Sequence, residues 1–130
     1  MIKDNIKQSH NLFTLNNKVI IVTGALGLLG QKHVEVIAQN GGVPIILDIN
    51  KNEVYLAAEK IKQKYHVQSV GLDVDITNEK KIIDSCKKII EKYGHIDGLV
   101  NNAANNPKVE EIENKNFSKL ENFPIEIWNK

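Results

Sequence analysis

The stretch Lys18–Gly30 reads K-V-I-I-V-T-G-A-L-G-L-L-G. It opens with a β-branched run, Val19–Val22, which is typical of a strand buried on both faces of a parallel sheet. Three glycines follow it, Gly24, Gly27 and Gly30, and a segment with helical periodicity begins near Leu28. Glycine lets a backbone turn tightly and approach a ligand closely, and a helix N-terminus offers unpaired N–H groups and partial positive charge. This order predicts a pyrophosphate-binding turn, with a turn that serves packing alone as the alternative.

Length and composition indicate one ordinary globular domain. The 130 residues carry a formal net charge of +1, with lysines and acids interspersed, so charge favours neither a nucleic-acid nor a membrane partner. No apolar run approaches the roughly 18 residues of a membrane span, and the first ten residues lack the apolar core of a secretion signal. Cys86 is the only cysteine, and no histidine pairs with it or with another histidine at helical spacing. We therefore expect a cytoplasmic protein without a disulfide or a metal site.

Outside the glycine turn, strand and helix patterns alternate. The predicted strands cover 18–23, 43–47, 67–73 and 96–100, and the predicted helices cover 28–40, 51–65 and 78–93. This alternation predicts an α/β fold with a doubly wound parallel sheet and right-handed crossovers. The strand order 3-2-1-4 would place the glycine turn where the order reverses, which is where such sheets bind ligands.

Local signals set the ends of these elements. Asn50 and either Thr77 or Asn78 are candidate helix N-caps, and Gly94 is a candidate helix stop. Pro44 would remove a ladder hydrogen bond from mid-strand, so we place it among the first residues of its strand. The predicted apolar stripe of the third helix consists of Ile82, Ile83, Cys86, Ile89 and Ile90.

The two ends of the chain are more polar. Residues 1–17 are interpreted as a leader whose L-F-x-L segment, 12–15, packs at the domain edge; a disordered tail is the alternative. Residues 105–121 form a polar connection of the length that is usually functional or mobile. Pro124 suits the first turn of a fourth helix.

Polar side chains follow the last three predicted strands. Asp48, 18 residues beyond Gly30, could accept hydrogen bonds from both ribose hydroxyls of an adenosine and would repel a 2′-phosphate. No arginine lies in the glycine turn or directly after Asp48, so we expect NAD rather than NADP. The alternative for Asp48 is a turn or helix-capping aspartate.

Asp75 would meet the adenine amino group of a nucleotide, or it would cap the following helix, and the two roles can coexist. Asn101 and Asn102 follow the fourth strand beside the glycine turn, where their amides could bond the neighbouring backbone and a ribose. A plain turn is the alternative.

Together with Asp48, the motifs at Thr23–Gly30, Asp75–Thr77 and Asn101–Ala104 resemble the short-chain dehydrogenase/reductase family. The resemblance implies a Rossmann-type NAD(P)-binding domain over 18–130, incomplete on its C-terminal side, with Asn102 steadying the sheet. The cofactor-binding residues that it implies are Gly24, Gly27, Leu29, Gly30, Asp48, Ile49, Asp75, Ile76, Asn101 and Ala103.

Two departures from the family pattern concern the motifs. The glycine spacing T-G-x-x-G-x-x-G is that of a longer-chain branch, and Ala104 replaces the usual last glycine of N-N-A-G. Neither change should abolish dinucleotide binding. The N-N-P-K-V and E-N-F-P-I-E-I-W segments are similar to bacterial members associated with surface-sugar and flagellin-glycan biosynthesis.

A third departure concerns the chemistry. In the family a serine, a Y-x-x-x-K pair and a helix asparagine act on the substrate, and the tyrosine is the general acid/base. The tyrosines of this chain, none followed by lysine four residues later, are Tyr55, Tyr65 and Tyr93. We therefore expect the first half of an NAD-dependent oxidoreductase, without a catalytic residue of its own and inactive alone.

For the whole enzyme, the resemblance implies a small-molecule substrate such as a sugar or nucleotide-sugar, and a homo-oligomer. Two other classes stay open. One is a non-catalytic dinucleotide-binding module that senses redox state or serves as a scaffold. The other is a methyltransferase, which also places an acidic residue after its second strand; the Thr-Gly opening and the N-N-A-A segment argue against it.

Overall fold

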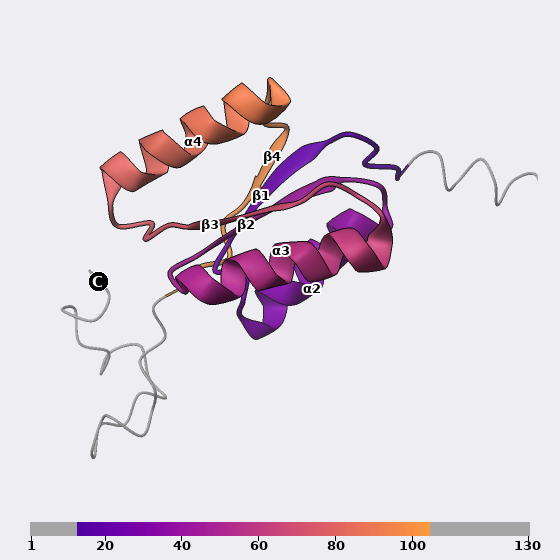
Figure 1. Ribbon diagram of the computed structural model, residues 1–130, viewed down its shortest axis with the longest axis horizontal. Coiled ribbons are helices and arrows are strands. Elements are labelled where there is room, and N and C mark those ends of the chain that lie inside the picture. Colours follow the sequence, from indigo (N-terminus) through magenta and orange to yellow (C-terminus); the bar gives the residue numbers. More distant parts are fainter. Residues whose placement is uncertain (1–12, 105–130) are drawn as a thin grey trace, which may run out of the picture.

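The computed structural model describes residues 13–104, which fold into a four-stranded parallel sheet with helices on both faces (Figure 1). Its elements in chain order are β1 (Val19–Thr23), α2 (Leu28–Gln39), β2 (Val43–Asp48), α3 (Lys51–Tyr65), β3 (Val70–Asp73), α4 (Glu79–Tyr93) and β4 (Gly98–Val100). The strand order is β3-β2-β1-β4, and all three pairings are parallel. The predicted fold class and strand order are confirmed.

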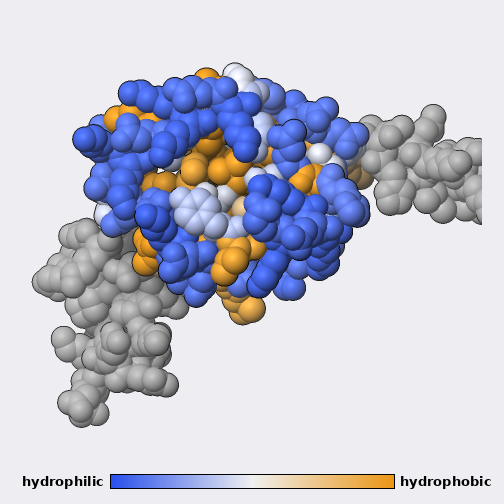
Figure 2. Space-filling model, viewed as in Figure 1, coloured by the Kyte–Doolittle hydropathy of each residue, from blue (hydrophilic) through white to orange (hydrophobic). Residues whose placement is uncertain are grey.

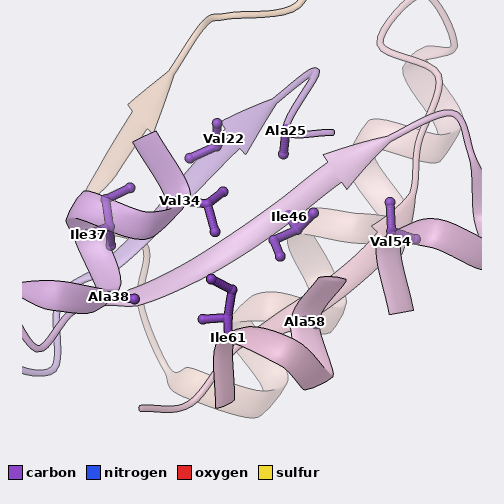
Figure 3. Close-up of a cluster of buried hydrophobic side chains, with 9 residues drawn as sticks. All are labelled: Val22, Ala25, Val34, Ile37, Ala38, Ile46, Val54, Ala58 and Ile61. Atoms are coloured by element: carbon purple, nitrogen blue, oxygen red, sulfur yellow. The ribbon is translucent and has the colours of Figure 1, made fainter. Parts of the chain in front are cut away.

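The two faces of the sheet are covered unequally. Of the helices among residues 13–104, α2 and α3 lie on one face and α4 lies on the other (Figure 1). Alternate residues of a strand point to opposite faces, so Val22 and Ile46 pack under α2 and α3 while Ile21 and Ile45 pack toward α4. Figure 3 shows the first of these two clusters, in which side chains from β1, β2, α2 and α3 point toward one another.

Helix α4 packs along a narrower line than its sequence predicts. Ile89 is 2% exposed, whereas the expected stripe residues Ile82, Ile83 and Ile90 are 37–46% exposed. Ser85 is buried on the same helix, and its hydroxyl donates to the Ile82 carbonyl at 2.7 Å, so its polar group has a partner. A single helix on a twisted sheet contacts it along one ridge, which leaves the margins of a broad apolar stripe uncovered.

β1 begins one residue later than predicted, and two other strands begin two or three residues later, for identifiable reasons. β3 starts at Val70 because Pro44 has no N–H with which to extend the β2 ladder; the Ser69 hydroxyl instead donates to the Pro44 carbonyl at 2.8 Å. β4 starts at Gly98 because the preceding Asp97 accepts the Val19 N–H with its side chain at 2.8 Å. Pro44 lies at the second position of its strand, as predicted.

The helix ends follow the predicted signals. Asn50 caps α3 by accepting the Glu53 N–H, and Asn78 rather than Thr77 caps α4 by accepting the Lys81 N–H. Gly94 ends α4 with a φ of 82°, in the left-handed region that glycine adopts readily.

The space-filling view is mostly hydrophilic over α3 and α4, with hydrophobic atoms showing between them along the sheet (Figure 2). No helix among residues 13–104 has the length and apolar content of a membrane span. Of the predicted L-F-x-L segment, Leu15 is half-buried against the α2–α3 cluster, while Phe13 is 74% exposed. Leu12, the long connection and the helix predicted from Pro124 lie outside the described residues.

Candidate functional site

The polar residues singled out in the sequence meet at one edge of the sheet. In a parallel sheet the carboxyl ends of all strands lie at the same edge, so the segments that follow β1, β2, β3 and β4 come together there. Asp48 ends β2 itself, and the segments carry the glycine turn, Asp75 and the pair Asn101–Asn102. The turn lies at the point where the strand order reverses.

Two glycines of the turn are required by the protein itself. Gly24 has a φ of +58°, and a Cβ there would lie 2.8 Å from the Ala103 Cα. A Cβ on Gly30 would collide with the Gly24 carbonyl oxygen and lie 2.7 Å from the Ala25 Cα. The packing alternative therefore accounts for these two positions, which let the turn fold tightly against itself and against the end of β4.

Gly27 differs from them. Its φ of −68° and ψ of 169° suit any residue, and a Cβ there would meet one atom, the Gly24 carbonyl oxygen at 3.3 Å. Gly27 is exposed, so the space that its missing side chain leaves opens to solvent. Packing thus requires glycine only weakly here, and the open space would admit a closely approaching ligand.

The helix that starts at this glycine also has an open N-terminus. Gly27 is the N-cap of α2, no side chain within residues 13–104 caps the helix, and its first turn contains no acidic residue. By contrast, Asn50 and Asn78 cap α3 and α4, each of which has a glutamate in its first turn. The first N–H groups of α2, and the positive end of its dipole, are therefore available to an anion.

Asp48 is held directly beside this turn. Its Oδ2 accepts the Leu26 N–H at 3.0 Å, and its Oδ1 accepts the Ile49 N–H at 2.8 Å. These bonds fix a half-buried carboxylate against the glycine turn, with Ile49 itself 75% exposed next to it. Asp48 therefore stabilises the turn, which is the alternative role expected for it. Each carboxylate oxygen can still accept a hydrogen bond from a further donor.

Asp75 lies on the adjacent connection, after β3. Its Oδ1 accepts both the Thr77 hydroxyl at 2.7 Å and the Thr77 N–H at 2.9 Å, and these bonds hold the pKa of Asp75 below its usual value. The cap of α4 is Asn78, so the Asp75 carboxylate stabilises the turn before the helix. Ile76, between the two partners, is 44% exposed.

A hydrogen-bond network joins the end of β4 to the glycine turn. The buried Thr23 hydroxyl donates to the Val100 carbonyl at 3.3 Å and accepts the N–H groups of Asn102 and Ala103, both at 3.0 Å. The Asn102 amide donates to the carbonyls of Thr23 and Gly24 at 3.1 and 3.0 Å. Asn102 thus ties the two strands together, whereas Asn101 is exposed. Sequence reasoning missed the central role of Thr23, whose only signal was its place directly before the turn.

The residues implied as cofactor-binding therefore lie along one sheet edge, at the carboxyl ends of the four strands that the structure describes. Within residues 13–104, no group of three or more His, Cys, Asp or Glu side chains is placed to hold a metal ion. The arrangement combines a glycine turn, an open helix N-terminus and a carboxylate after β2. These features define a Rossmann-type nucleotide-binding domain.

Comparison with known proteins agrees with this class. Residues 18–125 match the family model described as short chain dehydrogenase, and the chain belongs to that oxidoreductase family. It is 34% identical over 89 residues to "Post-translational flagellin modification protein A" of Campylobacter coli, covering 68% of this chain and 35% of the relative. It is 32% identical over 118 residues to "NAD-dependent glycerol dehydrogenase" of Listeria innocua, covering 91% and 41%.

A solved structure gives the same result. The chain resembles a 7α-hydroxysteroid dehydrogenase complexed with NADH and 7-oxo glycochenodeoxycholic acid, with a TM-score of 0.68 and 32% identity. The match covers 75% of this chain and 37% of that one. The chain thus spans between 35% and 41% of the length of the three proteins compared.

Proposed function

We propose that this chain is the NAD-binding part of an NAD-dependent oxidoreductase of the short-chain dehydrogenase family. One observation carries the proposal: an exposed glycine, Gly27, begins a helix that no side chain of the described residues caps, and the neighbouring Leu26 N–H is held by the Asp48 carboxylate at 3.0 Å. This hydrogen bond holds the Asp48 carboxylate, which would accept the ribose hydroxyls, beside the space at Gly27 that would receive the pyrophosphate. NAD, when bound, supplies hydride transfer.

Different residues along this sheet edge suit different parts of the dinucleotide. The N-terminus of α2 would hold the pyrophosphate at Gly27, Leu29 and Gly30, beside Gly24. Asp48 would accept the adenosine ribose hydroxyls, and the exposed apolar side chains of Ile49 and Ile76 would border the adenine. The remaining proposed contacts are Asp75 at the adenine amino group, and Asn101 and Ala103 along the cofactor.

The preference for NAD over NADP rests on charge. A 2′-phosphate would be repelled by the Asp48 carboxylate, and the N-terminus of the following helix α3 is already capped by Asn50. Two of the proteins compared are described with NAD or NADH, which supports the same preference.

We also propose that the acid/base residues of the reaction do not come from this chain, since none of its tyrosines is followed by lysine at the Y-x-x-x-K spacing. The substrate of the whole enzyme would be a small molecule, and we propose a sugar or nucleotide-sugar, as the family resemblance implies. We propose a homo-oligomer for that enzyme.

Calorimetric titration of the chain with NAD, NADP and S-adenosylmethionine tests the proposal. We expect saturable binding of NAD, at least about tenfold weaker binding of NADP, and none of S-adenosylmethionine. Asp48→Ser should reduce this discrimination. Equal affinity for NAD and NADP would contradict the role of Asp48, and binding of S-adenosylmethionine alone would favour a methyltransferase.

A further inference from the structure

Both polar backbone groups of Leu26 are held by side chains. Its N–H donates to Asp48 Oδ2 at 3.0 Å, and its carbonyl accepts the Gln31 side-chain amide, Nε2, at 2.7 Å. The backbone N–H of Gln31 also donates to the next carbonyl, that of Gly27, at 3.0 Å. One residue of α2 therefore binds two successive carbonyls of the glycine turn.

These bonds set the direction in which the turn's N–H groups point. A trans peptide is planar, with its carbonyl and N–H on opposite sides, so fixing one fixes the other. Gln31 holds the Leu26 carbonyl while the Gly27 N–H donates to the Gly24 carbonyl at 3.1 Å, which fixes both ends of the Leu26–Gly27 peptide. Holding the Gly27 carbonyl likewise directs the Leu28 N–H out of the helix start.

Gly27 makes this bracing necessary. Glycine rotates about its backbone more freely than other residues, so the Leu26–Gly27 peptide can reverse at low cost if its carbonyl has no partner. A reversed peptide would break the bond from the Gly27 N–H to the Gly24 carbonyl and would set the Leu26 carbonyl oxygen against the Gly24 carbonyl oxygen. Because two carbonyl oxygens repel each other, the turn would open, and the first N–H groups of α2 would lose the arrangement in which they can receive an anion.

The Gln31 side chain acts from behind the turn. Gln31 and Leu26 line a groove of about 410 Å³ between α2 and α3, together with Leu56 and Lys60 of α3. We propose that Gln31 is a positioning residue of the dinucleotide site, whose side-chain amide locks the glycine turn in its anion-binding conformation from this groove. This inference rests on the proposed function for its ligand, but the bracing itself is a property of the unliganded chain.

The test uses Gln31→Met, which keeps the length of the side chain and removes its donor. Gln39→Met is the matched control, because Gln39 is an exposed glutamine at the last position of the same helix. We expect Gln31→Met to weaken NAD binding about fivefold, the size of effect for one hydrogen bond, and to accelerate amide exchange at Gly27 in the unliganded chain. Gln39→Met should change neither.

Gln31→Lys provides the rescue, since its ammonium can again donate to the Leu26 carbonyl. Because the lysine also adds charge near the turn, its effect is read from the Gly27 exchange rate without ligand, which should return toward that of the wild type. Unchanged exchange and affinity in Gln31→Met, or equal changes in Gln39→Met, would overturn the inference. A wild-type chain that binds no dinucleotide would overturn the proposed function. The Gly27 amide exchange rates of the unliganded chains would still show whether the Gln31 side chain holds the turn.

Discussion

The three glycines of the turn have different physical reasons to be glycine. At Gly24 and Gly30 a side chain would meet the protein's own backbone, and at Gly27 it would enter open space in front of an uncapped helix. A sequence motif treats these positions alike. The structure separates the two that shape the turn from the one that leaves room for a ligand.

This difference predicts opposite outcomes for two alanine substitutions. Gly30→Ala should destabilise the fold by about 2–4 kcal/mol, because its Cβ overlaps the Gly24 carbonyl and the Ala25 backbone. Gly27→Ala should cost less than about 1 kcal/mol and still weaken NAD binding at least tenfold by occupying the space for the pyrophosphate. Urea unfolding and calorimetric titration separate the two effects. A Gly27→Ala chain that binds NAD normally would contradict the proposed site.

Residue types and spacing were enough to predict which residues meet at the sheet edge. Asp48 and Asp75 were found because a carboxylate within two residues of the end of a predicted strand is conspicuous in a sequence. Their hydrogen-bond partners were not predictable, because the contact between Asp48 and the Leu26 N–H depends on the conformation of the turn. The same holds for Gln31, which in the sequence is one more polar residue on an amphipathic helix.

At the scale of elements, helices were predicted more accurately than strands. The bounds of α3 agree with the prediction because its cap and its apolar spacing are both local signals. The starts of β3 and β4 depend on the neighbouring strand: Pro44 limits one ladder and Asp97 the other. Likewise, the sequence pattern identified the apolar residues of α4 but not which of them the sheet would bury.

Asp97 joins the amino ends of β1 and β4, and this junction should depend on pH. Its carboxylate accepts hydrogen bonds from the Lys18 ammonium at 2.9 Å and from the Val19 N–H at 2.8 Å, and His95 Nε2 lies 3.0 Å from it. These contacts lower the pKa of Asp97 below its ordinary value of 3.8. A lowered pKa means that the ionised form stabilises the fold. That contribution is complete well above pH 4 and is lost as the pH falls through the folded-state value.

Asp97→Asn should therefore be less stable than the wild type at pH 6, and the difference should shrink as the pH falls from about 5 to 2. Urea unfolding at a series of pH values measures this. Asp84→Asn, on the exposed face of α4, controls for the loss of one carboxylate. A stability difference between Asp97→Asn and the wild type that stays constant down to pH 2 would show that the ionised carboxylate contributes nothing to this junction.

At the scale of the whole molecule, the candidate site is held by contacts between distant parts of the chain. Asn102 and Thr23 are 79 residues apart in sequence and bond twice, while Asp48 reaches back 22 residues to Leu26. A ligand that spans the glycine turn and Asp48 would therefore bind only the folded chain. Its binding free energy should appear as stability of the entire domain.

We therefore expect NAD to raise the free energy of unfolding by about 2.7 kcal/mol at a concentration one hundred times its dissociation constant. For a domain of this length that corresponds to an increase in melting temperature of about 10 °C, measurable by scanning calorimetry. NADP at the same concentration should give a clearly smaller shift, because its 2′-phosphate would lie against Asp48. Gly27→Ala should melt near the wild type without ligand and should lose most of the NAD shift. If NAD stabilised Gly27→Ala as much as the wild type, the dinucleotide would have to bind elsewhere on the domain, since the added methyl group occupies the space proposed for the pyrophosphate.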